Sequence, residues 1–493
     1  MSTYSNIAKT TGIIGAVKVI MMFFGIIRAK IIAMVLGSAG FGYYGLYNSV
    51  TDLVSTVSSL GLNQSGVRQI AKSNAQNDSQ QVSKTYTILH LSILITSLLG
   101  TLFICIFSKT ISLKLFNTTD YYWGVCIVSL VVLFNGVSNG QIAILNGLKQ
   151  IKSMAICQII GAVFGSLSTI ILILLWGDAA IPASIALVAL TMLLSTGYYL
   201  KKLHLKPTRL SFAEMKTELK GLLGIGISLS IAAAVANLMT YFSRIYLKDA
   251  MGIEVVGIYQ SCWTLSNMYV GMILSAMGVD FMPRIMTYIQ NNAKVSDCIN
   301  EQIELGVLIA GIGILASFIF APIMLNLFYS KEFEIGTSII RWQLVGVLFR
   351  VFGFSFGYVI TAKGKGLLYI IIQSLFFISE YLLLIGCTKW FGLDGLGINY
   401  FIAYLLYIFV GGFTCAKIVG YRPSAFLFQI TGALFIFICI VALLNYFISN
   451  PWIFYGTSSL VLAVNLYWTH KTLTTRMGIN LIQLVRSKLK KNA

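Results

Sequence analysis

Runs of twenty or more apolar residues recur along the chain from Gly12 to Trp468, separated by short segments that carry charge, Gly or Pro. An α-helix rises about 1.5 Å per residue, so about 20 residues cross the hydrocarbon core of a bilayer. The pattern predicts an all-α polytopic membrane protein with about 14 transmembrane helices. Their expected limits are 11–37, 41–62, 83–107, 121–145, 153–176, 179–200, 222–250, 254–280, 303–328, 337–361, 366–388, 393–416, 424–448 and 451–469.

Composition and charge agree with this interpretation. Of the 493 residues, 57% are hydrophobic and 10% are charged, whereas a soluble domain carries about a quarter charged residues. If both termini are cytoplasmic, the inward segments hold 24 of the 35 Lys and Arg residues and the outward segments hold 5. This bias favours an even number of spans with both termini inside. Most of the net charge of +19 then faces the anionic cytoplasmic leaflet, and no nucleic acid is needed to explain it.

Several classes of function are disfavoured by what the connecting segments contain. Eight cysteines are scattered without metal-binding or CxxC spacing, so we expect small buried hydrophobes and no disulfide or metal. No cleaved signal peptide is expected. The longest outward loop is roughly 108–120, which leaves no room for the external catalytic loop of a membrane glycosyltransferase, ligase or polymerase.

An internal repeat organises the chain. Equivalent residues recur at an offset of 215 or 216, and the matched pairs are Arg28 with Arg244, Gly37 with Gly252, Gly42 with Gly257, Tyr44 with Tyr259, Arg68 with Arg284, and Lys149 with Lys365. Six spans separate the copies, so both have the same orientation in the membrane. The repeat predicts two six-helix bundles related by a pseudo-two-fold axis along the membrane normal, with a transport pathway between them.

The expected domains follow from the repeat. They are an N-terminal bundle at 1–203, a cytoplasmic amphipathic linker at 204–221, a C-terminal bundle at 222–420, an additional helix pair at 421–469 and a basic cytoplasmic tail at 470–493. The linker contains a capping-box pattern at Ser211 and Glu214, followed by Met215 and Leu219 at helical spacing. We expect this segment and a second amphipathic helix in the tail, 477–489, to lie in the cytoplasmic interface.

Four arginines lie within spans, where a charge costs about 2.5–3.5 kcal/mol on insertion scales and therefore needs a role or an escape. Arg341 is close enough to an outer end to extend to the membrane surface, which leaves three. Arg350 is near the middle of the span 337–361, while Arg28 and Arg244 hold equivalent positions in the two repeats. Guanidinium stays charged and binds phosphate through paired hydrogen bonds. We expect the three arginines to line a cavity and to receive a pyrophosphate.

Polar stripes accompany these arginines. Asn48 and Asp52 belong to a helical stripe with Ser55 and Ser59, and the repeat partner of Asp52 is Asn267, which follows Gln260 and Thr264. Such stripes face a cavity or a neighbouring helix, and the carboxylate favours the cavity. Asn48 and Asn267 are therefore candidates for substrate binding.

Two acids and a set of tyrosines leave alternatives open. Asp52 and Glu380 lie near the centres of their spans, where each either balances an arginine or carries H⁺ or Na⁺ during transport. No other cofactor is expected. Several tyrosines offer ring faces to sugars, although ordinary packing explains them better; they are Tyr43, Tyr44, Tyr47, Tyr400, Tyr404 and Tyr407.

Four segments carry a resemblance to a known family: LGSAGFGYYGLY after the first arginine, GLNQSGVRQIAK, LNGLKQIK and FYSKEF. They resemble the polysaccharide-transport (Wzx-type O-antigen) flippases of the multidrug/oligosaccharidyl-lipid/polysaccharide (MOP) exporter superfamily, over essentially the whole chain. The resemblance implies a V-shaped pair of bundles in the bacterial cytoplasmic (inner) membrane. It also implies movement of an undecaprenyl-pyrophosphate-linked oligosaccharide to the outer leaflet by alternating access, beside a polysaccharide polymerase and chain-length machinery.

Other functions of the same fold stay open. A lipid II flippase fits the same charges. A cation-coupled multidrug exporter would favour acids over arginines in its cavity, so the arginines argue against it. A membrane glycosyltransferase or polymerase is less compatible with the short outward loops.

Overall fold

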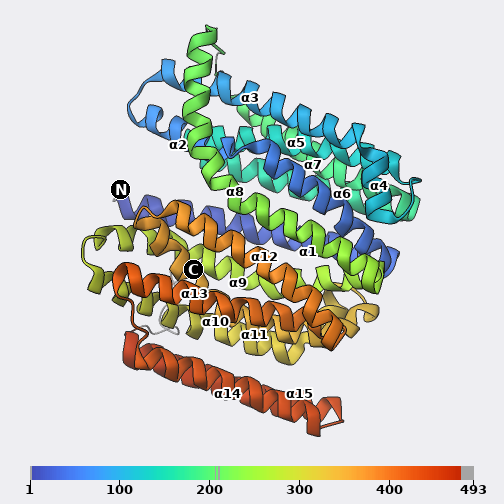
Figure 1. The fold of residues 1–493 in the computed structure, drawn as a ribbon, viewed down its shortest axis with the longest axis vertical. Helices are drawn as coiled ribbons and strands as arrows, with labels where there is room; N and C mark the ends of the chain where they lie inside the picture. Colours follow the sequence, from blue (N-terminus) through green and yellow to red (C-terminus); the bar gives the residue numbers. More distant parts are fainter. Residues whose placement is uncertain (1–2, 206, 209–210, 479–493) are drawn as a thin grey trace, which may run out of the picture. The chain divides into compact units, whose positions relative to one another are not determined.

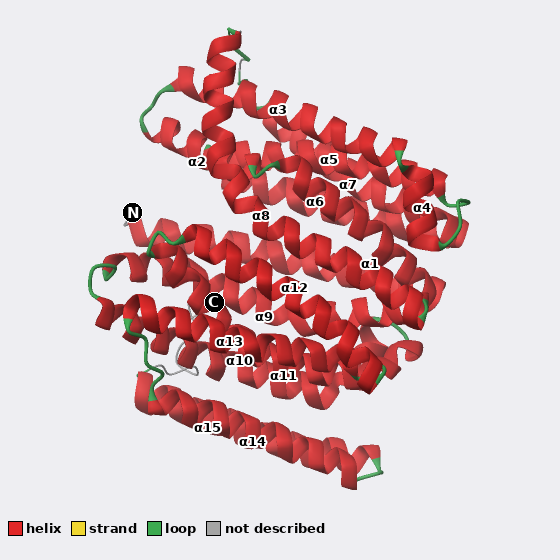
Figure 2. Ribbon diagram, viewed as in Figure 1, coloured by secondary structure: helices red, strands yellow, loops and turns green. Residues whose placement is uncertain are grey.

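The computed structural model describes residues 3–205, 207–208 and 211–478. Over these ranges the chain forms helices joined by short loops, and no strand occurs (Figure 2). The first part of the chain contains α1 (Thr3–Ser59), α2 (Leu62–Ala75), α3 (Ser79–Ile106), α4 (Ser108–Phe116), α5 (Tyr122–Gly147), α6 (Ile151–Trp176), η1 (Gly177–Ala180), α7 (Ile181–Lys201) and α8 (Phe212–Met251). The second contains α9 (Ile253–Thr287), α10 (Asn292–Phe328), η2 (Lys331–Gly336), α11 (Thr337–Ala362), α12 (Gly366–Phe391), α13 (Gly395–Val419), α14 (Ala425–Phe447) and α15 (Pro451–Met477).

The helices follow the apolar runs of the sequence closely. Apart from a few residues at their ends, the predicted spans fall within helices, and the first two share α1. A break at Gly37 divides α1, because its φ of 66° and ψ of −166° lie in a region that only glycine adopts readily. Two short helices were not expected: α2 follows the second predicted span, and α4 forms where the sequence predicted a loop.

The length and composition of the helices define a membrane protein. Within the described ranges, nine helical stretches are long and apolar enough to cross a bilayer, and the bent helix α9 raises the number to ten. Two of the nine, Gly15–Ser59 with 45 residues and Ile151–Lys201 with 51, are more than twice as long as the roughly 20 residues that one crossing needs. The protein is therefore an all-helical, multi-pass membrane protein.

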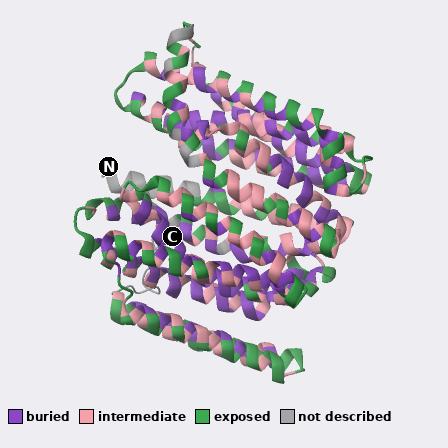
Figure 3. Cartoon of the chain, viewed as in Figure 1, coloured by how far each residue is buried: buried purple, intermediate pink, exposed green. Residues whose placement is uncertain are grey.

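Apolar side chains cover the outer faces of these helices. Buried and exposed positions alternate around each helix (Figure 3). Exposed side chains include Leu99, Phe103, Leu174, Trp390 and Phe428, each more than half accessible. Such an extensive apolar surface is stable in lipid rather than in water.

The helices form two compact units. The first consists of Met1–Gln260 with Leu327–Glu332, and the second of Ser261–Asn326 with Phe333–Ala493. In the first unit, α6 packs on α7 and α1, α5 packs on α3 and α7, and α8 packs on α1 and α2 (Figure 1). In the second, α13 packs on both α11 and α12, and α14 packs on α15.

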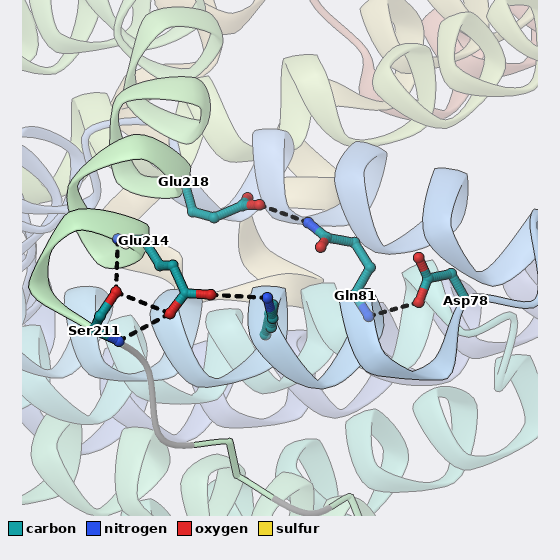
Figure 4. Close-up of polar contacts among 6 residues, drawn as sticks. Asp78, Gln81, Ser211, Glu214 and Glu218 are labelled. Atoms are coloured by element: carbon teal, nitrogen blue, oxygen red, sulfur yellow. Dashed lines mark hydrogen bonds and ion pairs between the residues drawn. The ribbon is translucent and has the colours of Figure 1, made fainter.

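The N-terminus of α8 contains the predicted capping box (Figure 4). The hydroxyl of Ser211 accepts the Glu214 N–H at 3.3 Å, and the Glu214 carboxylate accepts the Ser211 N–H at 3.0 Å. Lys84 of α3 forms an ion pair with Glu214 at 3.0 Å, and Gln81 donates to Glu218 at 2.6 Å. The backbone bond from Ser211, followed by the contact with Lys84, lowers the pKa of Glu214 to about 2. The capping-box prediction is confirmed.

The segment that follows differs from the expected interface helix. Helix α8 runs without interruption from Phe212 to Met251, so the predicted linker helix is its first turns. Met215 and Leu219 pack against a core cluster that includes Leu62, Ile88 and Leu145. The apolar face of this segment is therefore covered by protein, because α2, α3 and α5 supply a hydrophobic surface for it. The predicted tail helix, 477–489, lies almost entirely outside the described residues.

Candidate functional site

In the first unit, three helices converge on the guanidinium of Arg244. Arg244 lies on α8 and is 8% exposed. Its Nη1 donates to the carbonyl oxygen of Gly45 on α1 at 2.6 Å, and its Nη2 donates to the side-chain oxygen of Gln260 on α9. Both acceptors are neutral. Arg244 is thus buried and hydrogen-bonded, and among the described residues no acid forms an ion pair with it.

Asp52 lies on α1 near this arginine. Its side chain is exposed, and it interacts electrostatically with Arg244. Between described residues, no ion pair within 4.0 Å joins the two groups. Asn237, seven residues before Arg244 on the same face of α8, donates to Thr56 Oγ1 at 2.7 Å and to the Asp52 carbonyl at 3.5 Å. These bonds hold α8 against the polar stripe of α1.

The other two candidates of the first unit, Arg28 and Asn48, make fewer hydrogen bonds than Arg244. Arg28 is half-buried on α1 and makes no hydrogen bond or ion pair to another residue of the described chain. Asn48 is half-buried, and its amide donates to the carbonyl oxygen of Tyr44, one turn earlier on the same helix, at 2.8 Å. Of the three predicted arginines, Arg28 therefore has the least occupied guanidinium.

In the second unit, Arg350 of α11 meets Asn267 of α9. Arg350 Nη1 donates to Asn267 Oδ1, and the hydroxyl of Tyr400 on α13 donates to the same oxygen at 2.8 Å. The Asn267 amide nitrogen donates to the Trp263 carbonyl at 2.9 Å and to Ser266 Oγ at 3.2 Å. Because every bond of this amide is used, Asn267 is fixed with its oxygen toward the two donors.

Glu380 of α12 completes this second cluster. The side chain is half-buried and interacts electrostatically with Arg350 and Tyr400. As with Asp52, no ion pair within 4.0 Å is formed between the acid and the arginine of the described unit. Asn399 donates to the Glu380 carbonyl oxygen at 3.5 Å. Each unit thus contains a deep arginine held by neutral acceptors and a nearby acid that does not pair with it.

The structure brings several predicted residues together. Arg350, Asn267 and Glu380 share one cluster, and Arg244 and Asp52 share the other. Tyr47, Tyr400 and Tyr407 are buried in helix contacts, as ordinary packing predicts. Sequence reasoning missed Asn237, although its seven-residue spacing from Arg244 places both on one face of α8.

The groups in these clusters are suited to binding polar and anionic ligands. Guanidinium groups bind phosphate oxygens, whereas amides and hydroxyls bind sugars and carbonyls. Among the described residues, no group of three or more His, Cys, Asp and Glu side chains is arranged to hold a metal ion.

Residues 7–289 match the protein family described as Polysaccharide biosynthesis protein. The chain belongs to this family. It is a flippase family of the MOP superfamily, whose members are transporters and not enzymes. The resemblance inferred from the sequence is confirmed.

The relatives that match have low sequence identity, but the matches cover most of both chains. The lipid III flippase of Escherichia coli (strain K12) is 23% identical over 397 residues, which are 78% of this chain and 92% of that protein. The lipid II flippase MurJ, solved in an inward closed conformation, superposes with a TM-score of 0.73 at 12% identity, covering 96% of this chain and 100% of that chain. An inward-facing MATE multidrug transporter superposes with a TM-score of 0.65 at 16% identity, covering 80% and 95%. The chain shares the fold of these transporters.

Proposed function

We propose that this protein flips an undecaprenyl-pyrophosphate-linked oligosaccharide from the cytoplasmic to the outer leaflet by alternating access. The pyrophosphate and sugars lose hydration if they enter hydrocarbon, so they need a polar path, while the lipid tail remains in the bilayer. The similarity to a protein named lipid III flippase over most of both chains supports a lipid-linked saccharide as the substrate class.

The observation that carries this proposal is that none of the three deep arginines forms an ion pair with an acid among the described residues. Arg244 and Arg350 bind neutral oxygens, and Arg28 binds no described residue. Their positive charges are therefore available to an anionic head group. An exporter of organic cations would need the opposite bias, with acids exceeding arginines in the cavity.

The three arginines have different tasks in this proposal. Arg28 offers its guanidinium to the pyrophosphate first, because no protein acceptor has to be displaced. Arg244 and Arg350 keep amide oxygens of Gln260 and Asn267 in the positions that phosphate oxygens would take. A charged phosphate oxygen is a stronger acceptor for guanidinium than an amide oxygen. Exchange of one for the other lets the head group move past each arginine. Asn48 would add a contact to the saccharide.

The proposed topology has fourteen crossings. The two parts of α1, separated at Gly37, and α3 and α5 to α15 supply that number of helical segments. In this topology we propose two six-helix bundles at 1–203 and 222–420 related by a pseudo-two-fold axis, with α14 and α15 as an added pair; the sequence repeat supports this arrangement. The excess of Lys and Arg on inward segments supports cytoplasmic termini in a bacterial inner membrane.

Asp52 and Glu380 are the candidates for ion coupling in this scheme. Each interacts electrostatically with a substrate-binding arginine without neutralising it by a direct bond. If they carry H⁺ or Na⁺, Asp52→Asn and Glu380→Gln will retain downhill exchange in proteoliposomes but lose stimulation by an imposed ion gradient. If they only balance charge, stimulation by the gradient will persist in both variants.

The decisive test of function is a substrate comparison in proteoliposomes. Fluorescent undecaprenyl-pyrophosphate oligosaccharide, lipid II and an organic cation are offered separately to the native protein. We expect translocation of the lipid-linked oligosaccharide and none of the cation. Movement of the cation alone would refute the proposal, and movement of lipid II alone would assign the protein to cell-wall synthesis. Co-purification with a polysaccharide polymerase or chain-length protein would test the proposed partners.

A further inference from the structure

Two glycines bring α1 and the beginning of α9 into backbone contact. A methyl group added to Gly42 would lie 2.3 Å from the carbonyl oxygen of Ile253. A methyl group added to Gly257 would lie 2.0 Å from the carbonyl oxygen of Ser38. Both distances are far below van der Waals contact, so no larger residue fits at either position without separating the helices. All four residues belong to the first unit.

These two contacts are copies of each other under the sequence repeat. An offset of 215 converts Ser38 into Ile253 and Gly42 into Gly257. The contact of Gly42 with Ile253 is thereby converted into the contact of Gly257 with Ser38. Exchange of the two partners is the signature of an axis of two-fold symmetry that passes through an interface. The crossing of α1 and α9 is therefore locally two-fold symmetric under the repeat.

A third segment is attached to this crossing by Glu332, between α10 and α11. The Glu332 carboxylate accepts the Ser38 N–H at 3.1 Å and also accepts the Ser38 hydroxyl. Ser38 directly follows the break at Gly37, so its N–H begins the second part of α1, where N–H groups lack helical acceptors and favour an anion. The ring of Tyr329, from the same connection, packs edge-on against the ring of Phe41, with 5.3 Å between the ring centroids.

The connection that contains Glu332 belongs to a different unit from the helices on either side of it. Leu327–Glu332 packs with the first unit, although the residues on both sides of it, in α10 and in η2 and α11, belong to the second. Helix α9 likewise begins in the first unit and continues in the second after Gln260. Both chain segments that enter the second unit from here are thus anchored at Ser38 and Gly42 of α1.

We infer that this crossing and Glu332 form a closure that must open during each transport cycle. The inference rests on the proposed flippase function and on the proposed orientation, which places this end of α1 on the outer side. Backbones in direct contact leave no room for a hydrated saccharide, so release at this end requires α1 and α9 to separate. Ser38 is buried in the closed crossing, but the Glu332 side chain is exposed. Water can therefore replace the serine as the partner of this carboxylate when the crossing opens, and the contact can form again when it closes.

A cross-link tests this closure directly. Ser38→Cys with Glu332→Cys places one thiol on each side of this contact. Because a cysteine is shorter than the glutamate it replaces, the two thiols are joined with a short bis-methanethiosulfonate reagent, which a reductant removes again. Cross-linking is expected to lower translocation at least tenfold, and reduction is expected to restore it. The matched control is Ser129→Cys beside the native Cys105, where the hydroxyl and thiol lie 3.5 Å apart on α5 and α3 within one unit. This pair is expected to cross-link without loss of transport. Equal transport by the cross-linked and reduced 38–332 pair would overturn the inference, as would failure of the reagent to join that pair.

Glycine variants provide a readout that needs no substrate. An Asn48→Cys reporter is labelled from the outer side with a membrane-impermeant maleimide, and labelling of the native chain is subtracted. Gly42→Ala and Gly257→Ala are expected to increase the labelling rate severalfold. Gly25→Ala and Gly271→Ala lie on the same two helices with no atom within 4 Å of the added methyl group, so they serve as controls. Unchanged labelling in folded Gly42→Ala and Gly257→Ala would contradict the closure, whatever substrate the protein carries.

Discussion

Arg28 and Arg244 hold matching positions in the two repeats, but their surroundings differ. Arg244 is 8% exposed and binds Gly45 and Gln260, whereas Arg28 is half-buried and binds no described residue. The two ligands of Arg244 are themselves repeat partners, since an offset of 215 converts Gly45 into Gln260. The equivalent amide is missing from the first repeat, because glycine has no side chain.

A second change separates the two arginines. Arg28 lies nine residues before Gly37, whereas Arg244 lies eight before Gly252. One residue turns an α-helix by about 100°, so the two guanidinium groups leave their helices in different directions. Both repeats thus contain an arginine at this position, but the hydrogen bonds that it makes differ. One arginine joins three helices, and the other is left available to a ligand.

The largest expected effect is on the thermal stability of the protein when each of the two arginines is replaced. Arg244→Ala removes the two hydrogen bonds that join α8 to α1 and α9, and a hydrogen bond to a charged group contributes about 1.5–3 kcal/mol. Arg28→Ala removes no described hydrogen bond. Thermal unfolding in detergent should therefore show a clear decrease in Tm for Arg244→Ala and little change for Arg28→Ala. Equal decreases in the two variants would show that Arg28 also has a structural partner.

An intermediate effect is expected at Asn267, the repeat partner of Asp52. Asn267→Asp places a carboxylate against Arg350, where it would compete with the pyrophosphate. We expect translocation slowed about tenfold, which corresponds to ~1.4 kcal/mol. Aspartate loses the bond from the Asn267 amide to the Trp263 carbonyl but keeps an acceptor for Arg350 and Tyr400, so its Tm should fall less than that of Asn267→Ala. The control Asn267→Ala leaves Arg350 and Tyr400 without their acceptor, so its Tm should fall. A native transport rate in Asn267→Asp would remove Arg350 from the pathway.

The smallest expected effect is at the N-terminus of α8. The folded-state pKa of Glu214 is lowered to about 2 from its ordinary value of 4.5. A lowered pKa means that the charged cap contributes its full stability above pH 4.5 and loses it as the pH falls toward 2. The protection factor for hydrogen exchange in the first turn of α8, which corrects the observed rate for the intrinsic pH dependence of amide exchange, should therefore stay constant down to pH 4 and fall below it. In Glu214→Gln, which retains the capping box without a charge, this fall should be absent.

Much of the fold could be predicted from the sequence, because lipid imposes a minimum length on each apolar helix. The predicted spans fall in helices, and the Ser211 cap was recognisable from its spacing. The short helices α2 and α4 were missed because their stability comes from packing rather than from hydrophobic length. The deep arginines and acids were also recognisable, since charges in apolar runs are rare.

The partners of these charges could not be predicted. Arg244 and Gly45 are 199 residues apart, and Arg350 and Asn267 are 83 apart. Their contacts depend on helix rotation, and a one-residue shift such as that of Arg28 changes the direction of a side chain. For the same reason, the repeat indicated which glycines correspond but not that Gly42 and Gly257 would meet.

The central claim is most directly tested by translocation of labelled undecaprenyl-pyrophosphate oligosaccharide in proteoliposomes that contain native protein or Arg28→Ala. The account predicts that the native protein moves the lipid and that Arg28→Ala, at unchanged Tm, moves it at least tenfold more slowly, with partial recovery in Arg28→Lys. Native rates in Arg28→Ala would contradict the account, because the arginine left free by the fold would then have no part in transport.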